Sequence, residues 1–247
     1  MQVKSTSIAV MLFTVFCFVN SFNKVTAQTS CSYVTVLWSE SFGKGTTSTS
    51  HPDVLNLGFS ETGALNDGYY RIINNTQQRP EWHAAPDYTP GDVDGKMLVV
   101  NGDGEKFYNK VLTNGVIGFS PGTYTARMFL MNVNTQGTCA PNALLPTISF
   151  KLEHSVDASG ETWVEAQTVT ANSVPQSLTP TWIQLAVLFN IPTSALRLRL
   201  SMTNGTTRGC GNDFAIDDIQ FAVCSEVDPL PVDFININAT QKGGAVA

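Results

Sequence analysis

Two carboxylates lie in strand-like segments near opposite ends of the chain, at positions where the alternation predicts apolar side chains. Asp217 shares a face with the apolar residues at every second position of 215–223, and Glu40 with those of 34–42. A buried carboxylate without a partner is strongly unfavourable. We therefore predict that a cation compensates both acids.

Calcium is the cation that fits best, because it prefers carboxylate and carbonyl oxygens and tolerates irregular geometry. The loop 87–95 adds three acids between glycine and proline residues, and its D-x-D-G piece lets oxygens converge. A full calcium-loop pattern is absent, because no Glu follows at the required spacing. Two alternatives stay open: a β-bulge that turns either acid into water, or an arginine partner such as Arg127.

Aromatic residues gather before and within the same acidic loop. Sugars stack on exposed aromatic rings that polar groups surround. Trp82 and Tyr88 are the predicted exposed ligand-binding residues of a glycan site. The alternative for Trp82 is a structural role as a cap on the fold.

Sequence patterns that carry catalysis are missing. There is no G-x-S-x-G elbow, phosphate loop, dinucleotide fingerprint or zinc pattern. Nothing singles out one pair of acids for glycoside hydrolysis. We expect no catalytic residues and no enzyme activity.

Short strand-like runs separated by turn residues occur along most of the chain. They predict an all-β antiparallel sandwich or barrel with almost no helix. The ten expected strands are 33–42, 68–74, 96–101, 106–112, 123–133, 147–154, 162–169, 182–191, 195–203 and 213–224.

The N-terminal segment 1–27 has the features of a secretory signal peptide. Lys4 precedes an apolar run, and Val25-Thr26-Ala27 offers small residues for cleavage. The run is short for a membrane span, so we expect none in the mature chain. Removal of Lys4 and Lys24 leaves 12 basic against 20 acidic residues, which moves the net charge from −6 to −8. Such an acidic, exported chain is a poor nucleic-acid binder.

The segment 28–224 is long enough for one sandwich domain. A proline-punctuated linker, 225–231, follows it, and a new apolar alternation begins at Val232. We expect 232–247 to be the start of a following module of a larger multidomain protein, with a simple tail as the alternative.

Four cysteines remain after the signal peptide, an even number for an oxidising compartment. Three pairings are open. We favour Cys31–Cys224, because both flank terminal strands, and Cys139–Cys210, because both lie in Gly/Asn-rich loops.

Several short motifs together resemble MAM-type and related jelly-roll modules of extracellular proteins. The motifs are Ser39-Glu40-Ser41-Phe42, Asp87-Tyr88-Thr89, Gly95-Lys96-Met97-Leu98-Val99-Val100-Asn101 and Asn212-Asp213-Phe214-Ala215-Ile216-Asp217-Asp218-Ile219. The sequence is also similar to sandwich modules at the front of large exported proteins of gliding-type gram-negative bacteria, which use type nine secretion. In those proteins Leu-Pro-Val commonly opens the next module, as Leu230-Pro231-Val232 does here.

The resemblance implies a galactose-binding-like or MAM-like jelly roll that is non-catalytic and holds a structural calcium. It places the calcium ligands at Glu40, Asp87 and Asp217, with Asp218 as a neighbour. Tyr88 departs from the pattern, because such modules often carry His there.

The sequence thus predicts a secreted or cell-surface binding module for glycans or another surface ligand. Two alternatives remain: the accessory domain of a secreted hydrolase whose catalytic part lies beyond this chain, and a structural spacer.

Overall fold

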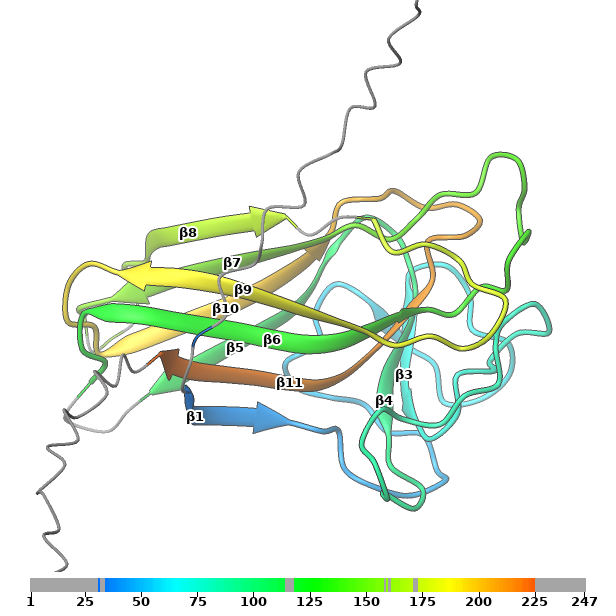
Figure 1. Ribbon diagram of the computed structural model, residues 1–247, viewed down its shortest axis with the longest axis horizontal. Helices are drawn as coiled ribbons and strands as arrows, with labels where there is room; N and C mark the ends of the chain where they lie inside the picture. Colours follow the sequence, from blue (N-terminus) through cyan, green and yellow to red (C-terminus); the bar gives the residue numbers. More distant parts are fainter. Residues whose placement is uncertain are drawn as a thin grey trace, which may run out of the picture.

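Two packed β-sheets make up the described part of the chain (Figure 1). The computed structural model describes residues 31, 34–113, 118–157, 159, 161–170 and 173–224. These residues contain no helix, and so none that could cross a membrane. The predicted signal peptide, the linker 225–231 and the segment 232–247 lie outside the described residues. The predicted all-β jelly-roll sandwich is confirmed.

All ten predicted strands are present, with ends that differ by at most two residues. A two-residue strand, β2, was not predicted. The strands are β1 (Val34–Glu40), β2 (Gly58–Phe59), β3 (Tyr69–Ile73), β4 (Met97–Asn101), β5 (Lys106–Thr113), β6 (Gly122–Asn132), β7 (Ile148–Ser155), β8 (Val164–Thr170), β9 (Ile183–Ile191), β10 (Arg197–Asn204) and β11 (Phe214–Cys224).

The larger sheet has the order β2-β3-β4-β11-β6-β9, and β1 also pairs with β11. The smaller sheet has the order β5-β10-β7-β8. All strand pairs are antiparallel except β2 with β3. The long strand β11 is central, because its first residues pair with β4, its later residues pair with β1, and β6 lies along its other edge.

The main core fills the space between the two sheets. It is rich in aromatic side chains that are almost fully inaccessible to water. Each such side chain contributes roughly 1.5–3 kcal/mol by its burial. The largest are Tyr108, Phe107, Phe150, Phe189, Phe214 and Phe221.

A second apolar layer covers part of the outer face of the larger sheet. Leu65, Trp82 and Ala85 come from long loops and pack against side chains of β4, β6 and β11, among them Met97 and Met131. These loops lie at the right-hand end of the molecule in Figure 1. Buried residues therefore occur on both faces of the sheet at this end, which strand alternation alone does not reveal.

A β-bulge interrupts β11 at Asp217 and Asp218. The register with β6 shifts between Asp217 and Gln220, and Asp218 has a positive φ of 49°. Ile216 and Ile219 both belong to the core between the sheets, whereas Asp217 lies on the outer face. The predicted shared face of Asp217 with Ile219 is therefore wrong, because the bulge inserts an extra residue.

Both predicted disulfides are present. Cys31 and Cys224 have a Cα–Cα distance of 5.4 Å, and Cys139 and Cys210 one of 5.7 Å. The first bond joins the segment before β1 to the end of β11. The second joins the loop after β6 to the loop after β10.

Candidate functional site

An acidic cluster lies where the loop 87–95 crosses the bulge of β11. The Tyr88 backbone amide donates to Asp217 Oδ2 over 2.9 Å, and the Thr89 hydroxyl donates to Asp218 Oδ1 over 3.0 Å. Asp217 is fully buried. Its Oδ1 has no hydrogen-bond partner among the described residues, so half of this buried carboxylate is uncompensated.

Asp87 joins Asp217 from the loop side of the cluster. Its carboxylate lies so close to Gly95 that a Cβ on Gly95 would be 2.1 Å from Asp87 Oδ2. A side chain at residue 95 would therefore displace the Asp87 carboxylate. Burial raises the pKa of Asp87, and the nearby Asp92 raises it further. The Lys44 ammonium pairs with Asp92 at the solvent side.

The surroundings of Asp217 disfavour its charge. Burial raises the pKa of Asp217 to about 7, and the charge of Asp218 acts in the same direction. The backbone amides of Asp218 and Tyr88 oppose this shift of the pKa without cancelling it. A carboxylate with these properties is one that a bound cation would stabilise.

Glu40 does not belong to this cluster. It lies opposite Ile219 in the pairing of β1 with β11, and its Oε2 is 3.2 Å from Nε2 of His51. His51 in turn stacks on Tyr108 of the opposite sheet. The hydrogen bond from His51 lowers the pKa of Glu40. Glu40 thus has its own partner, and the structure does not bring it together with Asp217 as one cation would require.

Side chains alone do not complete a metal site. Within the described ranges, no three His, Cys, Asp or Glu side chains are arranged to hold a metal ion. Calcium accepts backbone carbonyl and hydroxyl oxygens as well, so the loop backbone and Thr89 would have to complete the ligand set around Asp217.

Three aromatic residues, Tyr88, Phe129 and Trp182, form a group beside the cluster. Tyr88 stacks on Phe129 of β6, with ring centroids 3.3 Å apart and an angle of 13°. Trp182, just before β9, meets Tyr88 edge-on at 6.2 Å. All three are partly exposed. Together they form an aromatic edge on the outer face of the larger sheet.

Trp82 does not contribute to this edge. Only 1% of it is exposed, because it packs beneath the loops in the second apolar layer. The predicted exposure of Trp82 is wrong, and the alternative role as a structural cap agrees with its burial. Tyr88 is partly exposed, as a ligand-binding ring must be.

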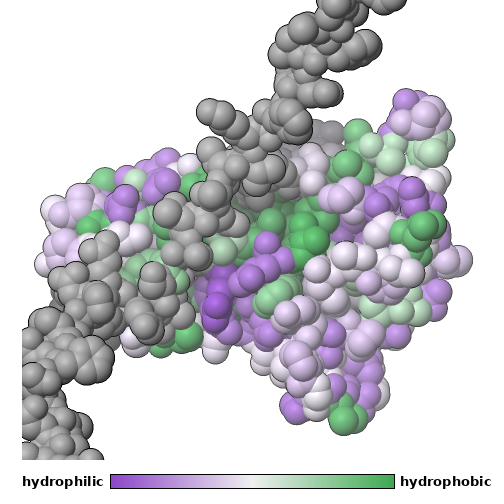
Figure 2. All heavy atoms as spheres, viewed as in Figure 1, coloured by the Kyte–Doolittle hydropathy of each residue, from purple (hydrophilic) through white to green (hydrophobic). Residues whose placement is uncertain are grey.

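Polar side chains continue the same face away from the aromatic group. Arg127 of β6 donates through Nε to Gln220 Oε1 of β11 over 2.8 Å. Figure 2 shows a hydrophobic area over the beginning of β9 and hydrophilic residues beside it over β6 and β11. The face thus combines aromatic rings with hydrogen-bonding groups.

Sequence reasoning missed Phe129 and Trp182. It named Arg127 only as an alternative partner of Glu40 or Asp217, whereas Arg127 donates to Gln220 instead. Phe129 and Arg127 alternate with buried residues along β6, so the two-residue period places them on the outer face. That signal could have found both. It could not have shown that the loop 87–95 brings Tyr88 onto Phe129.

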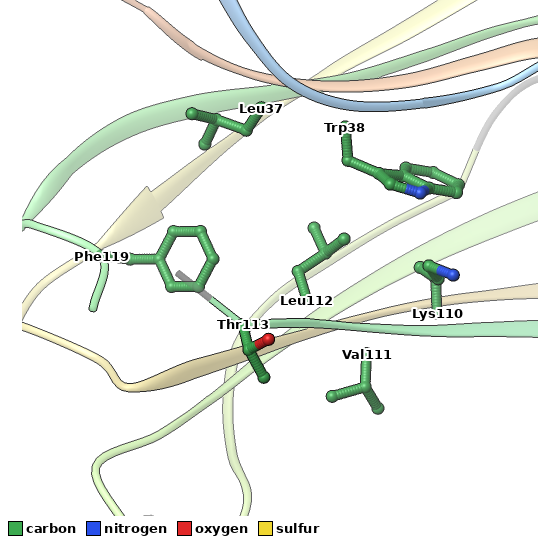
Figure 3. A pocket seen from close by; sticks show the side chains of 7 residues that line it. All are labelled: Leu37, Trp38, Lys110, Val111, Leu112, Thr113 and Phe119. Carbon is green, nitrogen blue, oxygen red and sulfur yellow. The ribbon is translucent and has the colours of Figure 1, made fainter. Parts of the chain in front are cut away.

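A separate pocket of about 270 Å³ opens at the edge between β1 and β5 (Figure 3). The Lys110 ammonium lies 5.2 Å from the centre of the Trp38 ring and 2.8 Å from Asp53 Oδ2. Lys110 is thus already neutralised by Asp53, so its charge is not free for a ligand. Its lining residues are Leu37, Trp38, Lys110, Val111, Leu112, Thr113 and Phe119.

Comparisons with known proteins give neighbours in structure only. No family model matches the chain, and no curated protein matches it. The xylan-binding CBM22-1 domain of Paenibacillus barcinonensis Xyn10C has 13% identity and a TM-score of 0.42, over 79% of this chain and 99% of that one. The C-terminal family 22 carbohydrate-binding module of Clostridium thermocellum Xyn10B has 15% identity and a TM-score of 0.38, over 78% and 96%.

The tailspike protein 4 domain of bacteriophage CBA120 has 13% identity and a TM-score of 0.40, over 66% of this chain and 18% of that one. At these identities and TM-scores, the likeness carries no conclusion about ligand or activity. The resemblance to MAM-type modules stays a prediction.

Proposed function

We propose that this chain is a non-catalytic carbohydrate-binding module of an exported protein, with its ligand on the outer face of β11, β6 and β9. The observation that carries the proposal is the aromatic group Tyr88, Phe129 and Trp182 beside polar side chains on an open sheet face. Sugar rings have apolar C–H faces and polar edges, which such a surface matches. The two disulfides support an oxidising, extracellular location.

The test is binding to a panel of soluble polysaccharides, followed by isothermal titration with any oligosaccharide that binds. Trp182→Ala is expected to weaken binding about tenfold or more, because a stacking ring is lost. Trp163→Ala is the matched control: Trp163 lies 4.3 Å from the Arg199 guanidinium on the smaller sheet. If Trp163→Ala weakens binding and Trp182→Ala does not, the ligand site is on the other sheet. If no polysaccharide binds, the function is wrong.

We also propose that calcium stabilises the fold at the acidic cluster. The support is the unpartnered, fully buried Oδ1 of Asp217 beside Asp87 and Asp218. A calcium ion would be held by Asp217, with Asp87, Asp218 and oxygens of the loop 87–95 as the further candidates, and would tie this loop to β11.

Thermal unfolding with calcium and with chelator tests the calcium proposal, because a ligand of the folded state raises its stability. Chelation is expected to lower the midpoint of the wild type and to leave that of Asp217→Asn unchanged. Glu40→Gln is the matched control and is expected to keep the response, because Glu40 pairs with His51 instead. A midpoint that chelation does not change in the wild type contradicts the proposal.

A further inference from the structure

Arg127 occupies the floor of the proposed glycan face. In the register of the sheet, it lies opposite Ala186 of β9 on one side and Gln220 of β11 on the other. Gln220 in turn lies opposite Ser39 of β1. Small side chains therefore flank the Arg127–Gln220 pair at both ends of this row, and Arg127 stays partly exposed.

Among the described residues, the charge of Arg127 has no acidic partner. Its Nε and Nη2 both donate to Gln220 Oε1, which is a neutral amide oxygen. In the described part of the chain Arg127 forms no ion pair, whereas Arg79, Arg199 and Arg208 each pair with a carboxylate. The described residues thus leave this partly buried guanidinium without a counter-charge.

The position of this charge relates it to the aromatic group. Phe129 follows Arg127 by two residues in β6, so both side chains project from the same face. Gln220 holds one edge of the guanidinium, and no described residue accepts a hydrogen bond from Nη1. The planar guanidinium is suited to oxyanions, which it binds with two parallel hydrogen bonds.

We propose that this face selects acidic glycans, with a carboxylate or sulfate group of the sugar bound to Arg127 while a ring stacks on the aromatic group. The inference rests on the proposed glycan-binding function and adds the class of ligand. Gln220 acts as a positioning residue that keeps the guanidinium in the plane of the face.

Matched oligosaccharides that differ only in charge provide the test. Oligogalacturonate is compared with its methyl ester, and sulfated carrageenan oligosaccharides with their desulfated form, by titration calorimetry. Wild type is expected to prefer one acidic member over its neutral counterpart about tenfold or more, because hydrogen bonds between charged groups are the strong ones. The pair that shows the preference identifies carboxylate or sulfate as the ligand group.

Arg127→Gln is expected to abolish that preference, so that the variant binds the acidic and the neutral member with equal affinity. The matched control, Arg197→Gln, removes the same charge from β10 of the smaller sheet, where Arg197 donates to the Ser159 carbonyl, and is expected to keep the preference. Equal affinity of wild type for acidic and neutral members overturns the inference, as does a preference that survives in Arg127→Gln. If the neutral oligosaccharides bind and Trp182→Ala weakens that binding, the proposed glycan binding holds and the proposed selection of acidic glycans does not. If no oligosaccharide binds, both proposals fail.

Discussion

Asp213 allows a quantitative prediction about stability and pH. The residue precedes β11 and is buried, and its Oδ1 accepts a hydrogen bond from the Gly102 backbone amide over 3.2 Å. Burial raises the pKa of Asp213 to about 6, although the hydrogen bonds from Gly102 and Asn134 oppose the shift. No described residue forms an ion pair with it. The folded protein therefore holds a charge at neutral pH that its surroundings disfavour.

The sign follows from proton linkage. An acid whose pKa is higher in the folded than in the unfolded state binds more protons when folded, so stability falls as pH rises between the two values. The shift from 3.8 to about 6 corresponds to roughly 3 kcal/mol of lost stability above the upper value. Asp213→Asn removes this pH-dependent cost. The side-chain amide oxygen of the variant can still accept the hydrogen bond from the Gly102 backbone amide. The variant loses the hydrogen bond from Asn134, which is worth about 1 kcal/mol.

We therefore expect Asp213→Asn to be about 2 kcal/mol more stable than wild type near pH 8, and equal or less stable near pH 4. Urea unfolding at the two pH values measures this difference. Glu161→Gln, an exposed acid, is the control and should change stability little at either pH. If the stability difference between Asp213→Asn and wild type is the same at both pH values, Asp213 does not carry the cost that its burial implies.

Three further changes test the packing. Gly95→Ala is expected to cost more than about 1 kcal/mol in thermal unfolding and to remove the calcium response, because its Cβ would displace the Asp87 carboxylate. Trp82→Ala should lower the free energy of urea unfolding by about 3–5 kcal/mol, because the buried indole leaves a cavity. Removal of the Cys31–Cys224 bond by a double serine variant should cost about 2–5 kcal/mol in the same assay, since it closes a separation of 193 residues.

The outcomes that contradict these predictions are specific. Gly205→Ala serves as control for Gly95, because its Cβ would have ordinary contacts, the nearest at 3.6 Å; equal effects of the two changes would show that any glycine is sensitive. If Trp82→Ala unfolds like wild type, the second apolar layer does not stabilise the domain. If the double serine variant keeps its stability, the terminal strands hold together without the bond.

Strand alternation predicted most of the fold because in strands such as β10 every second residue is apolar and faces the core between the sheets. The strand β4 differs, because it is buried on both faces. The strand β2 was missed because two residues are too few to show a period, and it exists only by pairing in parallel with β3. Trp82 was misjudged for a different reason. Alternation tells which side chains share a face of a strand, but it does not tell which loops fold back over that face and bury it.

Asp217 shows why part of the site could be predicted and part could not. A carboxylate among apolar residues in a strand correctly indicated a buried acid, and Asp217 is fully buried. The direction of its side chain depended on the bulge at Asp218, whose positive φ no residue type nearby demanded. Glu40 followed the same sequence pattern, yet it met His51, which comes from a loop whose path depends on tertiary packing.

The bulge links the acidic cluster to the aromatic group. By inserting one residue, it returns Ile219 to the core while it leaves Asp217 on the outer face, beneath the loop 87–95. The backbone amide of Tyr88 then binds Asp217, and the ring of the same residue stacks on Phe129. One residue thus connects the buried carboxylate to the aromatic surface. The two parts of the candidate site are therefore not independent, because a shift of the loop would move the stacking ring and uncover the carboxylate together.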